Sequence, residues 1–174
     1  MRHDLKRYLV TYRQLLQEGK YEVIEADIDK ILGKRLNTNH CVYTENTILN
    51  AVICEKMEQC SIKNIKIEVQ VNADKDMDSI EYGVVLSNLL DNAIEAEEQE
   101  KEENRYICLN IGVEQNMIHL VVSNYIALLE TSKKNKQLHG IGLRGVKEFV
   151  NNKEGEIEIF EENHMFVVHI CVCV

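Results

Sequence analysis

Two asparagines and two glycines are the residues of this chain whose types and spacing best suit the binding of a magnesium-bound triphosphate. Asn88 and Asn92 lie four positions apart in a run with a helical pattern. Their side chains therefore project from one face and can present two amide oxygens to a hard cation. Gly140 and Gly142 lie where a loop enters an apolar helix, a place where backbone N–H groups can bind phosphate oxygens. Together these residues predict a nucleotide site.

The helix that carries the two asparagines has recognisable ends in the sequence. Asp78, with Glu81 three residues later, resembles a capping box, so we expect the helix to begin there and to end near Glu97. The acidic run over residues 95–103 is most simply a solvated helix end followed by a loop. A second helix, expected from about Ile141 to Asn152, follows the glycines.

The neighbouring segments predict a mixed sheet. A helix is expected from Thr47 to Cys60, with Thr44 or Asn46 as its cap, and an alternating strand follows over residues 63–71. Two hairpins come later, with strands over residues 106–113 and 117–124, and over 155–160 and 164–174. The order of elements predicts an α+β fold, an α/β sandwich with helices on one face of the sheet.

The N-terminal segment predicts a separate helical hairpin. Apolar residues recur at helical spacing from Asp4 to Leu36, and Glu18-Gly19-Lys20 interrupts them. Two short helices cannot bury both apolar stripes alone, so we expect a second copy to complete a dimeric four-helix bundle. The expected domains are residues 1–38 for this hairpin and residues 39–174 for the nucleotide-binding fold.

The composition narrows the class of protein. With 174 residues, 45% of them hydrophobic, the chain can bury a core, and a formal net charge of -9 argues against nucleic acid as a partner. The six cysteines form no metal-ligand spacing, and no apolar run is long enough to span a membrane. These features are typical of a soluble protein in a reducing, cytoplasmic compartment.

Two sequence runs carry a resemblance to a known family. From Asn88 to Ala96 the chain reads Asn-Leu-Leu-Asp-Asn-Ala-Ile-Glu-Ala, and from His139 to Val146 it reads His-Gly-Ile-Gly-Leu-Arg-Gly-Val. The runs resemble the N box and the second glycine box of sensor histidine kinases of the GHKL ATPase superfamily, in particular the peptide-sensing quorum kinases of Gram-positive bacteria. The resemblance implies a Bergerat-type ATP-binding domain that uses ATP and Mg²⁺.

The same resemblance assigns roles to the site residues. Asn92 would be the magnesium ligand, and Asn88 would assist the metal or its water shell. ATP-hydrolysing relatives carry Glu at the position of Asn88, and a neutral amide cannot deprotonate water, which favours phosphoryl transfer over hydrolysis. The implied phosphate-binding residues are Lys133, Lys134 and Lys136 in a loop that resembles the ATP lid, then His139, Gly140, Gly142 and Leu143. Each lysine could equally serve only solubility, and His139 could only cap the helix.

The adenine pocket departs from the family pattern. Where the family usually has Asp-x-Gly-x-Gly, residues 124–128 read Asn-Tyr-Ile-Ala-Leu. Asn124 can still accept a hydrogen bond from the adenine amino group, but it carries no charge, and both glycines are replaced. We therefore expect a lowered affinity for ATP.

The first residues resemble the phosphoacceptor box of the same branch. His3 would take the phosphoryl group, and the neighbouring Asp4 would orient the imidazole and take its proton. The family often has Asn where Arg7 stands. Because a phosphoacceptor normally projects from a longer helix, we expect this chain to be a piece of a longer protein whose membrane-spanning sensor region precedes it.

These observations favour the cytoplasmic portion of a dimeric two-component histidine kinase, which phosphorylates His3 from ATP and passes the phosphoryl group to an aspartate of a response regulator. Two alternatives stay open. An ATP-independent phosphorelay phosphotransferase with a degenerate ATPase-like domain is favoured by the lost glycines at Ile126 and Leu128 and opposed by the two intact boxes. A dimerisation and regulator-binding module would use the nucleotide fold only as a scaffold.

Overall fold

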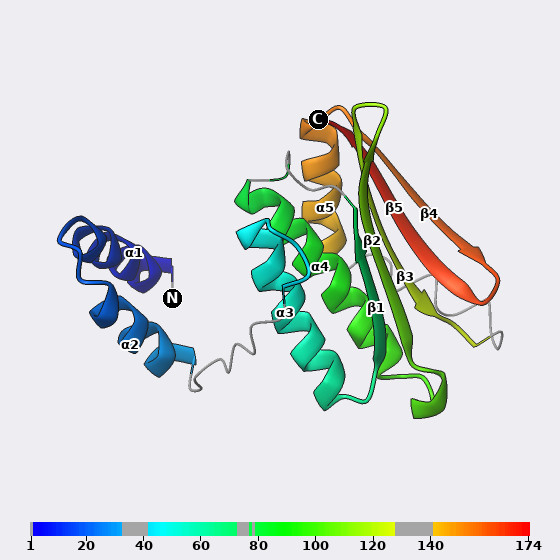
Figure 1. Cartoon of the computed structure of the whole chain (residues 1–174), viewed down its shortest axis with the longest axis horizontal. Coiled ribbons are helices and arrows are strands. Elements are labelled where there is room, and N and C mark those ends of the chain that lie inside the picture. The colour runs from blue at the N-terminus through cyan, green and yellow to red at the C-terminus, as the bar shows by residue number, and fades with distance from the viewer. Residues whose placement is uncertain (1, 33–41, 73–76, 78, 128–140) are drawn as a thin grey trace. The chain divides into compact units, whose positions relative to one another are not determined.

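A computed structural model describes residues 2–32, 42–72, 77, 79–127 and 141–174 of the chain. It divides into two compact units, Met1–His40 and Cys41–Val174, whose elements Figure 1 labels. No helix in the described ranges is long and apolar enough to cross a membrane.

The first unit contains two helices, α1 (Arg2–Gln17) and α2 (Tyr21–Leu32). Gly19 adopts a positive φ of 70° in the turn between them. The N–H of Lys20 donates to Leu15 O at 2.9 Å and that of Gly19 to Leu16 O at 3.1 Å, the two bonds of a Schellman motif. Glycine is favoured at this position because the left-handed conformation penalises a Cβ atom. The helical pattern is confirmed as far as Leu32, as is its interruption, whereas residues 33–36 lie outside the described part of the chain.

The second unit is built on a five-stranded mixed sheet with the strand order β1-β2-β3-β5-β4. The strands are β1 (Lys66–Val71), β2 (Tyr106–Glu114), β3 (Met117–Tyr125), β4 (Glu156–Glu162) and β5 (Met165–Cys173). Only β1 and β2 pair in parallel, and the other three pairings are antiparallel. Both hairpins turn through two residues of positive φ, Gln115-Asn116 and Asn163-His164, as tight hairpin turns require.

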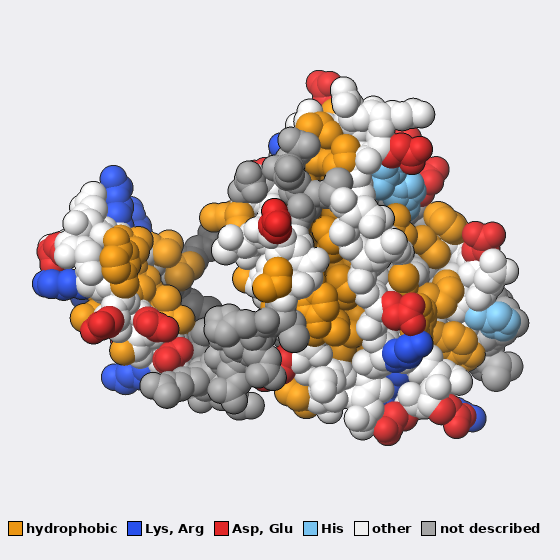
Figure 2. Space-filling model, in the orientation of Figure 1, with side chains coloured by type: hydrophobic (Ala, Val, Ile, Leu, Met, Phe, Trp, Pro, Cys, Tyr) orange, Lys and Arg blue, Asp and Glu red, His pale blue; other side chains and the backbone are white. Residues whose placement is uncertain are grey.

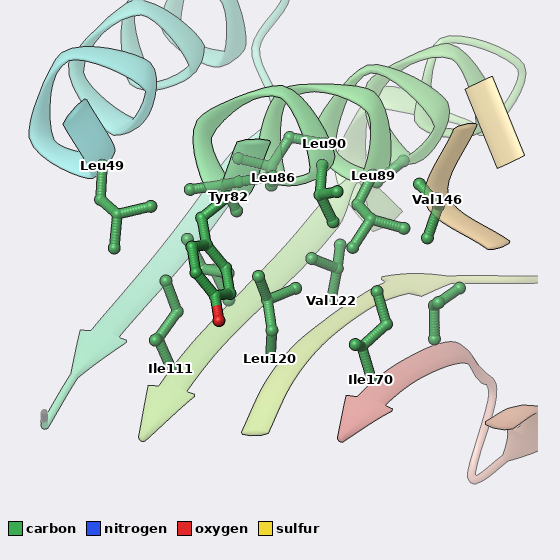
Figure 3. Close-up of a cluster of buried hydrophobic side chains, with 14 of the residues drawn as sticks. Leu49, Tyr82, Leu86, Leu89, Leu90, Ile111, Leu120, Val122, Val146 and Ile170 are labelled. Atoms are coloured by element: carbon green, nitrogen blue, oxygen red, sulfur yellow. The ribbon is translucent and has the colours of Figure 1, made fainter. Parts of the chain in front are cut away.

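Three helices cover one face of this sheet: α3 (Thr47–Ile62), α4 (Ile80–Glu97) and α5 (Ile141–Asn152) (Figure 1). Leucines of α4, among them Leu86 and Leu90, pack onto Leu120 and Val122 of β3 (Figure 3). Ile170 of β5 extends this core under α5. The predicted α+β fold, a mixed sheet packed with helices, is confirmed.

Some element boundaries differ from those expected. Asn46 is the cap of α3, because its side chain accepts a hydrogen bond from the Leu49 N–H at 3.0 Å. Ser79 caps α4 by accepting from the Glu81 N–H, whereas Asp78 lies outside the described residues. β1 begins three residues later than expected, at Lys66, because α3 continues to Ile62 and a turn follows.

Candidate nucleotide-binding site

α4 positions the two asparagines that the sequence singles out. Leu89 and Leu90, which lie between them, are 2% and 0% exposed and anchor the helix to the sheet. Asn88 and Asn92 are half-buried, and their four-residue spacing places them one turn apart on the same side of α4. The buried leucines therefore fix the direction in which both amides project.

The Asn92 amide is the best candidate ligand in this part of the molecule. Its Nδ2 atom is the one buried side-chain polar atom of the described residues that lacks a hydrogen-bond partner. An unsatisfied buried polar group costs about 1–3 kcal/mol, so such groups are rare in folded proteins. A 180° rotation of the amide exchanges its oxygen and nitrogen. Asn92 can therefore present an oxygen to Mg²⁺, which prefers oxygen ligands, or a donor to a phosphate.

α5 lies beside Asn88. A Cβ atom placed on Gly145 would be 3.9 Å from Nδ2 of Asn88, so α5 passes close to that amide. Farther along the two helices, the rings of Tyr82 and Phe149 meet edge to face with centroids 5.1 Å apart. Val146 of α5, which is fully buried, lies beside Leu89 of α4 (Figure 3). The structure thus brings the N-box helix and the helix that follows the glycines together.

The residues expected to bind phosphate are only partly described. Leu143 is 8% exposed and belongs to the hydrophobic core, and Gly142 lies in the first turn of α5. The other members of the expected set lie outside the described residues: Lys133, Lys134, Lys136, His139 and Gly140. The roles of all these residues stay predictions.

Asp91, between the two asparagines, serves the packing of helices. Its Oδ1 lies 2.7 Å from Nζ of Lys56, and the Lys56 side chain is only 4% exposed. Glu55 lies 3.2 Å from the same ammonium group. This pairing fixes α3 against α4, so the acidic residue of the N box already has a structural partner.

Asn124 is buried at the end of β3 and bonds to a carboxylate that sequence reasoning missed. Its Nδ2 donates to Oε1 of Glu97 at 3.3 Å and to the Tyr125 carbonyl oxygen at 3.1 Å. Glu97, the last residue of α4, is 0% exposed, and its Oε2 accepts from the Tyr106 N–H at 2.9 Å. The assignment of the whole acidic run to a solvated helix end and loop is therefore wrong at Glu97. Glu97 follows the buried Leu90 and Ala93 at helical spacing, and this spacing could have indicated from the sequence that Glu97 is buried.

Burial changes the acidity of this carboxylate. It raises the pKa of Glu97 from its ordinary value of 4.5 to about 6, and the nearby Glu100 carboxylate adds to the rise. Hydrogen bonds from the Tyr106 N–H and the Asn124 amide oppose it, because they stabilise the charged form. Glu97 therefore changes charge near pH 6.

The raised pKa predicts a pH-dependent stability. Because folded Glu97 binds its proton more tightly than the unfolded chain does, its contribution is fully present below pH 4.5 and is lost as the pH rises through about 6. Between these limits the free energy of unfolding should fall by about 1–2 kcal/mol relative to that of a Glu97→Gln variant. Urea unfolding of both proteins across this range measures the difference, and parallel pH curves would contradict the expectation.

His3 and Asp4, the expected phosphoacceptor pair, belong to the first turn of α1 in the other unit. The contacts of these two side chains lie outside the described part of the chain. Their assignment stays a prediction.

Comparison with known proteins identifies the family. Residues 77–173, more than half of the chain, match the family model described as the GHKL domain, so the chain belongs to the GHKL family. No curated protein matches the sequence significantly.

Several solved structures share the fold. The catalytic domain of histidine kinase ThkA, in a nucleotide-free form, has a TM-score of 0.59 and 20% identity, and the match covers 74% of this chain and 92% of that domain. Histidine kinase AdeS of Acinetobacter baumannii has a TM-score of 0.55 and 15% identity, and the match covers 94% of this chain and 84% of that protein. The histidine kinase domain of a blue-light activated kinase from Erythrobacter litoralis has a TM-score of 0.54 and 15% identity. That match covers 78% of this chain and 65% of the other. The chain therefore contains a GHKL ATPase domain with the fold of histidine kinase catalytic domains, and this family implies the use of ATP.

Proposed function

We propose that the chain is the kinase portion of a two-component sensor histidine kinase of the peptide-sensing quorum branch. In this proposal the GHKL domain binds ATP with Mg²⁺, His3 accepts the γ-phosphoryl group, and an aspartate of a response regulator receives it next. The observation that carries the proposal is the buried Nδ2 of Asn92, which lacks a hydrogen-bond partner among the described residues, one helical turn after Asn88, which lies beside α5. A family member that used its fold only as a scaffold would gain nothing from leaving this group unsatisfied.

The described residues suit a transfer site. Asn92 would hold Mg²⁺, which when bound neutralises charge on the triphosphate. Asn88 cannot act as a general base toward water, because its amide has no basic lone pair near neutral pH. Water is therefore a poor competitor with the histidine acceptor. Asn124 would accept a hydrogen bond from the adenine amino group.

The proposed reaction forms one bond and breaks one bond. An imidazole nitrogen of His3 attacks the γ-phosphorus, and a nitrogen–phosphorus bond forms. The bond from the γ-phosphorus to the bridging oxygen breaks, and ADP leaves with that electron pair. Asp4 takes the imidazole proton. Positioning and charge neutralisation supply most of the acceleration in phosphoryl transfer.

The first unit supports the proposed homodimer. Leu5, Leu9 and Ile31 are between 55% and 60% exposed, although they belong to apolar helix stripes. Figure 2 shows hydrophobic side chains on the surface of this unit. The exposed apolar residues are Leu5, Tyr8, Leu9, Val10, Leu16, Tyr21, Val23, Ile28 and Ile31. A second hairpin that packs as a four-helix bundle would remove them from water. In the proposal, a membrane-anchored sensor region precedes this cytoplasmic hairpin.

One observation favours the ATP-independent phosphotransferase as a second candidate. The N–H of Ile126, where the family has glycine, donates to the His164 carbonyl oxygen at 2.9 Å. The backbone at this position therefore continues the pairing of β3 with β5, so it is less free to approach a base. This candidate keeps the transfer from His3 to aspartate and drops the use of ATP.

A binding experiment followed by a labelling experiment tests the proposal. Calorimetric titration with ATP should show binding that requires Mg²⁺, and no binding at millimolar nucleotide would favour the second candidate. Incubation with Mg²⁺ and ATP labelled at the γ-phosphate should then phosphorylate His3, as located by mass spectrometry. His164, an exposed histidine in the β4–β5 turn, is the internal control and should stay unlabelled. Label on His164 and not on His3 would contradict the assignment.

A further inference from the structure

We propose that Glu97 fixes the orientation of the Asn124 amide and so makes the base pocket select a 6-aminopurine over a 6-oxopurine. This inference rests on the proposed function, in which Asn124 faces the base. Glu97 acts as a positioning residue, because it contacts Asn124 and not the nucleotide. It gives a specific role to a buried carboxylate that the phosphoryl transfer itself does not use.

The amide nitrogen of Asn124 donates hydrogen bonds to two acceptors. One N–H donates to Oε1 of Glu97 at 3.3 Å, and the other donates to the Tyr125 carbonyl oxygen at 3.1 Å. Both hydrogens of Nδ2 are thereby used. Among the described residues, no hydrogen bond reaches Oδ1 of Asn124. The oxygen is therefore the atom left for a ligand.

Glu97 is itself held in place. It ends α4 with a fully buried side chain, and its second oxygen accepts the Tyr106 N–H at 2.9 Å. Tyr106 begins β2, so the carboxylate is fixed between the helix layer and the sheet. If the Asn124 amide rotated by 180°, Oδ1 would face the Glu97 carboxylate and the Tyr125 carbonyl. Both contacts would join two acceptors, and each lost hydrogen bond costs about 1–3 kcal/mol in a buried site.

The fixed orientation has a chemical consequence for nucleotide choice. Adenine carries an amino group at position 6, which can donate to Oδ1 of Asn124. Guanine and hypoxanthine carry an oxygen there, which would face Oδ1 as a second acceptor. A site with one correctly oriented acceptor should bind 6-aminopurines about 10- to 100-fold more tightly than 6-oxopurines, because one unmade hydrogen bond costs about 1–3 kcal/mol.

Glu97 also explains why position 124 is an asparagine. A carboxylate in place of the Asn124 amide would lie about as close to Glu97 as Nδ2 does, at 3.3 Å. No cationic side chain of the described residues pairs with Glu97, so two carboxylates would meet in a buried place without compensation. Like charges at such a distance cannot both stay ionised. The neutral amide at 124 and the carboxylate at 97 therefore form a matched pair that carries one negative charge.

The test compares ATP and GTP binding, each with Mg²⁺, by calorimetry in three proteins. The wild type should prefer ATP by at least about tenfold. In Glu97→Gln, the new amide can accept from the Tyr106 N–H only with its oxygen, so its nitrogen faces Asn124 and favours the rotated amide. The preference for ATP should then fall about tenfold. In Glu97→Gln/Asn124→Asp, the carboxylate at 124 accepts from that nitrogen and offers its other oxygen to adenine, so the preference should return.

Matched controls separate this inference from its alternatives. Glu103→Gln removes an exposed carboxylate just beyond α4 and should leave the ratio of affinities unchanged. Circular dichroism should show that all variants are folded. An unchanged ratio in Glu97→Gln, or a double variant no better than the single one, would overturn the inference and leave the proposed function standing. A wild type that binds neither nucleotide at millimolar concentration would overturn the proposed function and the inference with it.

Discussion

Asn92→Ala should lower the affinity for Mg²⁺-ATP about 10- to 100-fold and should leave the free energy of unfolding unchanged or slightly raised. The loss follows from the removal of the proposed metal ligand, since one charge-assisted interaction contributes about 1.5–3 kcal/mol. The gain in stability follows because the wild-type amide has a buried Nδ2 without a partner among the described residues. Removing a buried group that makes no hydrogen bond removes a cost.

These opposite effects separate a ligand-binding role from a structural one. Calorimetry with ATP, with and without Mg²⁺, measures the affinity, and urea unfolding without nucleotide measures stability. Asn50→Ala is the matched control, because Oδ1 of Asn50 accepts the Tyr43 N–H at 2.9 Å and supports the start of α3. That variant should lose about 1 kcal/mol of stability and keep its ATP affinity. Retained Mg²⁺-ATP binding in Asn92→Ala would end the assignment of Asn92 as the metal ligand.

The parts of the fold that sequence reasoning predicted well depend on local patterns. The helical spacing from Leu86 to Ala93 predicts α4, and the alternation along β3 predicts a strand with one buried face. Both patterns record which face meets the core, so the mixed sheet and its helical layer could be inferred from the sequence alone. The N box could be found for the same reason, since both of its asparagines lie on one helix.

The details that sequence reasoning missed depend on contacts between distant positions. Glu97 looks like one more charge in an acidic run, and only its contacts with Tyr106 and Asn124, 9 and 27 residues away, show that it is buried and bonded. Asn124 looked like an aspartate weakened by the loss of its charge. The structure shows instead an amide whose nitrogen donates hydrogen bonds to two acceptors. A local sequence pattern cannot show such a hydrogen-bonded pair, because the stabilisation depends on a partner residue that is distant in the sequence.

The turn between α5 and β4 holds a glycine whose replacement should strongly destabilise the GHKL domain. A Cβ atom on Gly155 would lie 2.5 Å from the Cys171 carbonyl oxygen and 2.5 Å from Cγ1 of Val172, closer than real Cβ contacts allow. The carbonyl belongs to the backbone of β5 and cannot rotate away as a side chain could. Gly155→Ala should therefore lower the free energy of unfolding by about 2–4 kcal/mol, at or above the range for overpacked sites.

A second glycine supplies the matched control for this prediction. A Cβ atom on Gly112 in β2 would meet nothing within 4 Å, so Gly112→Ala should change stability by less than about 1 kcal/mol, in either direction. Urea unfolding followed by circular dichroism compares the two variants with the wild type. Equal stability of the Gly155→Ala and Gly112→Ala proteins would contradict the expectation. The same clash should weaken nucleotide binding, because the Gly155 N–H, bonded to Val150 O at 2.9 Å, joins β4 to the helix that packs beside Asn88.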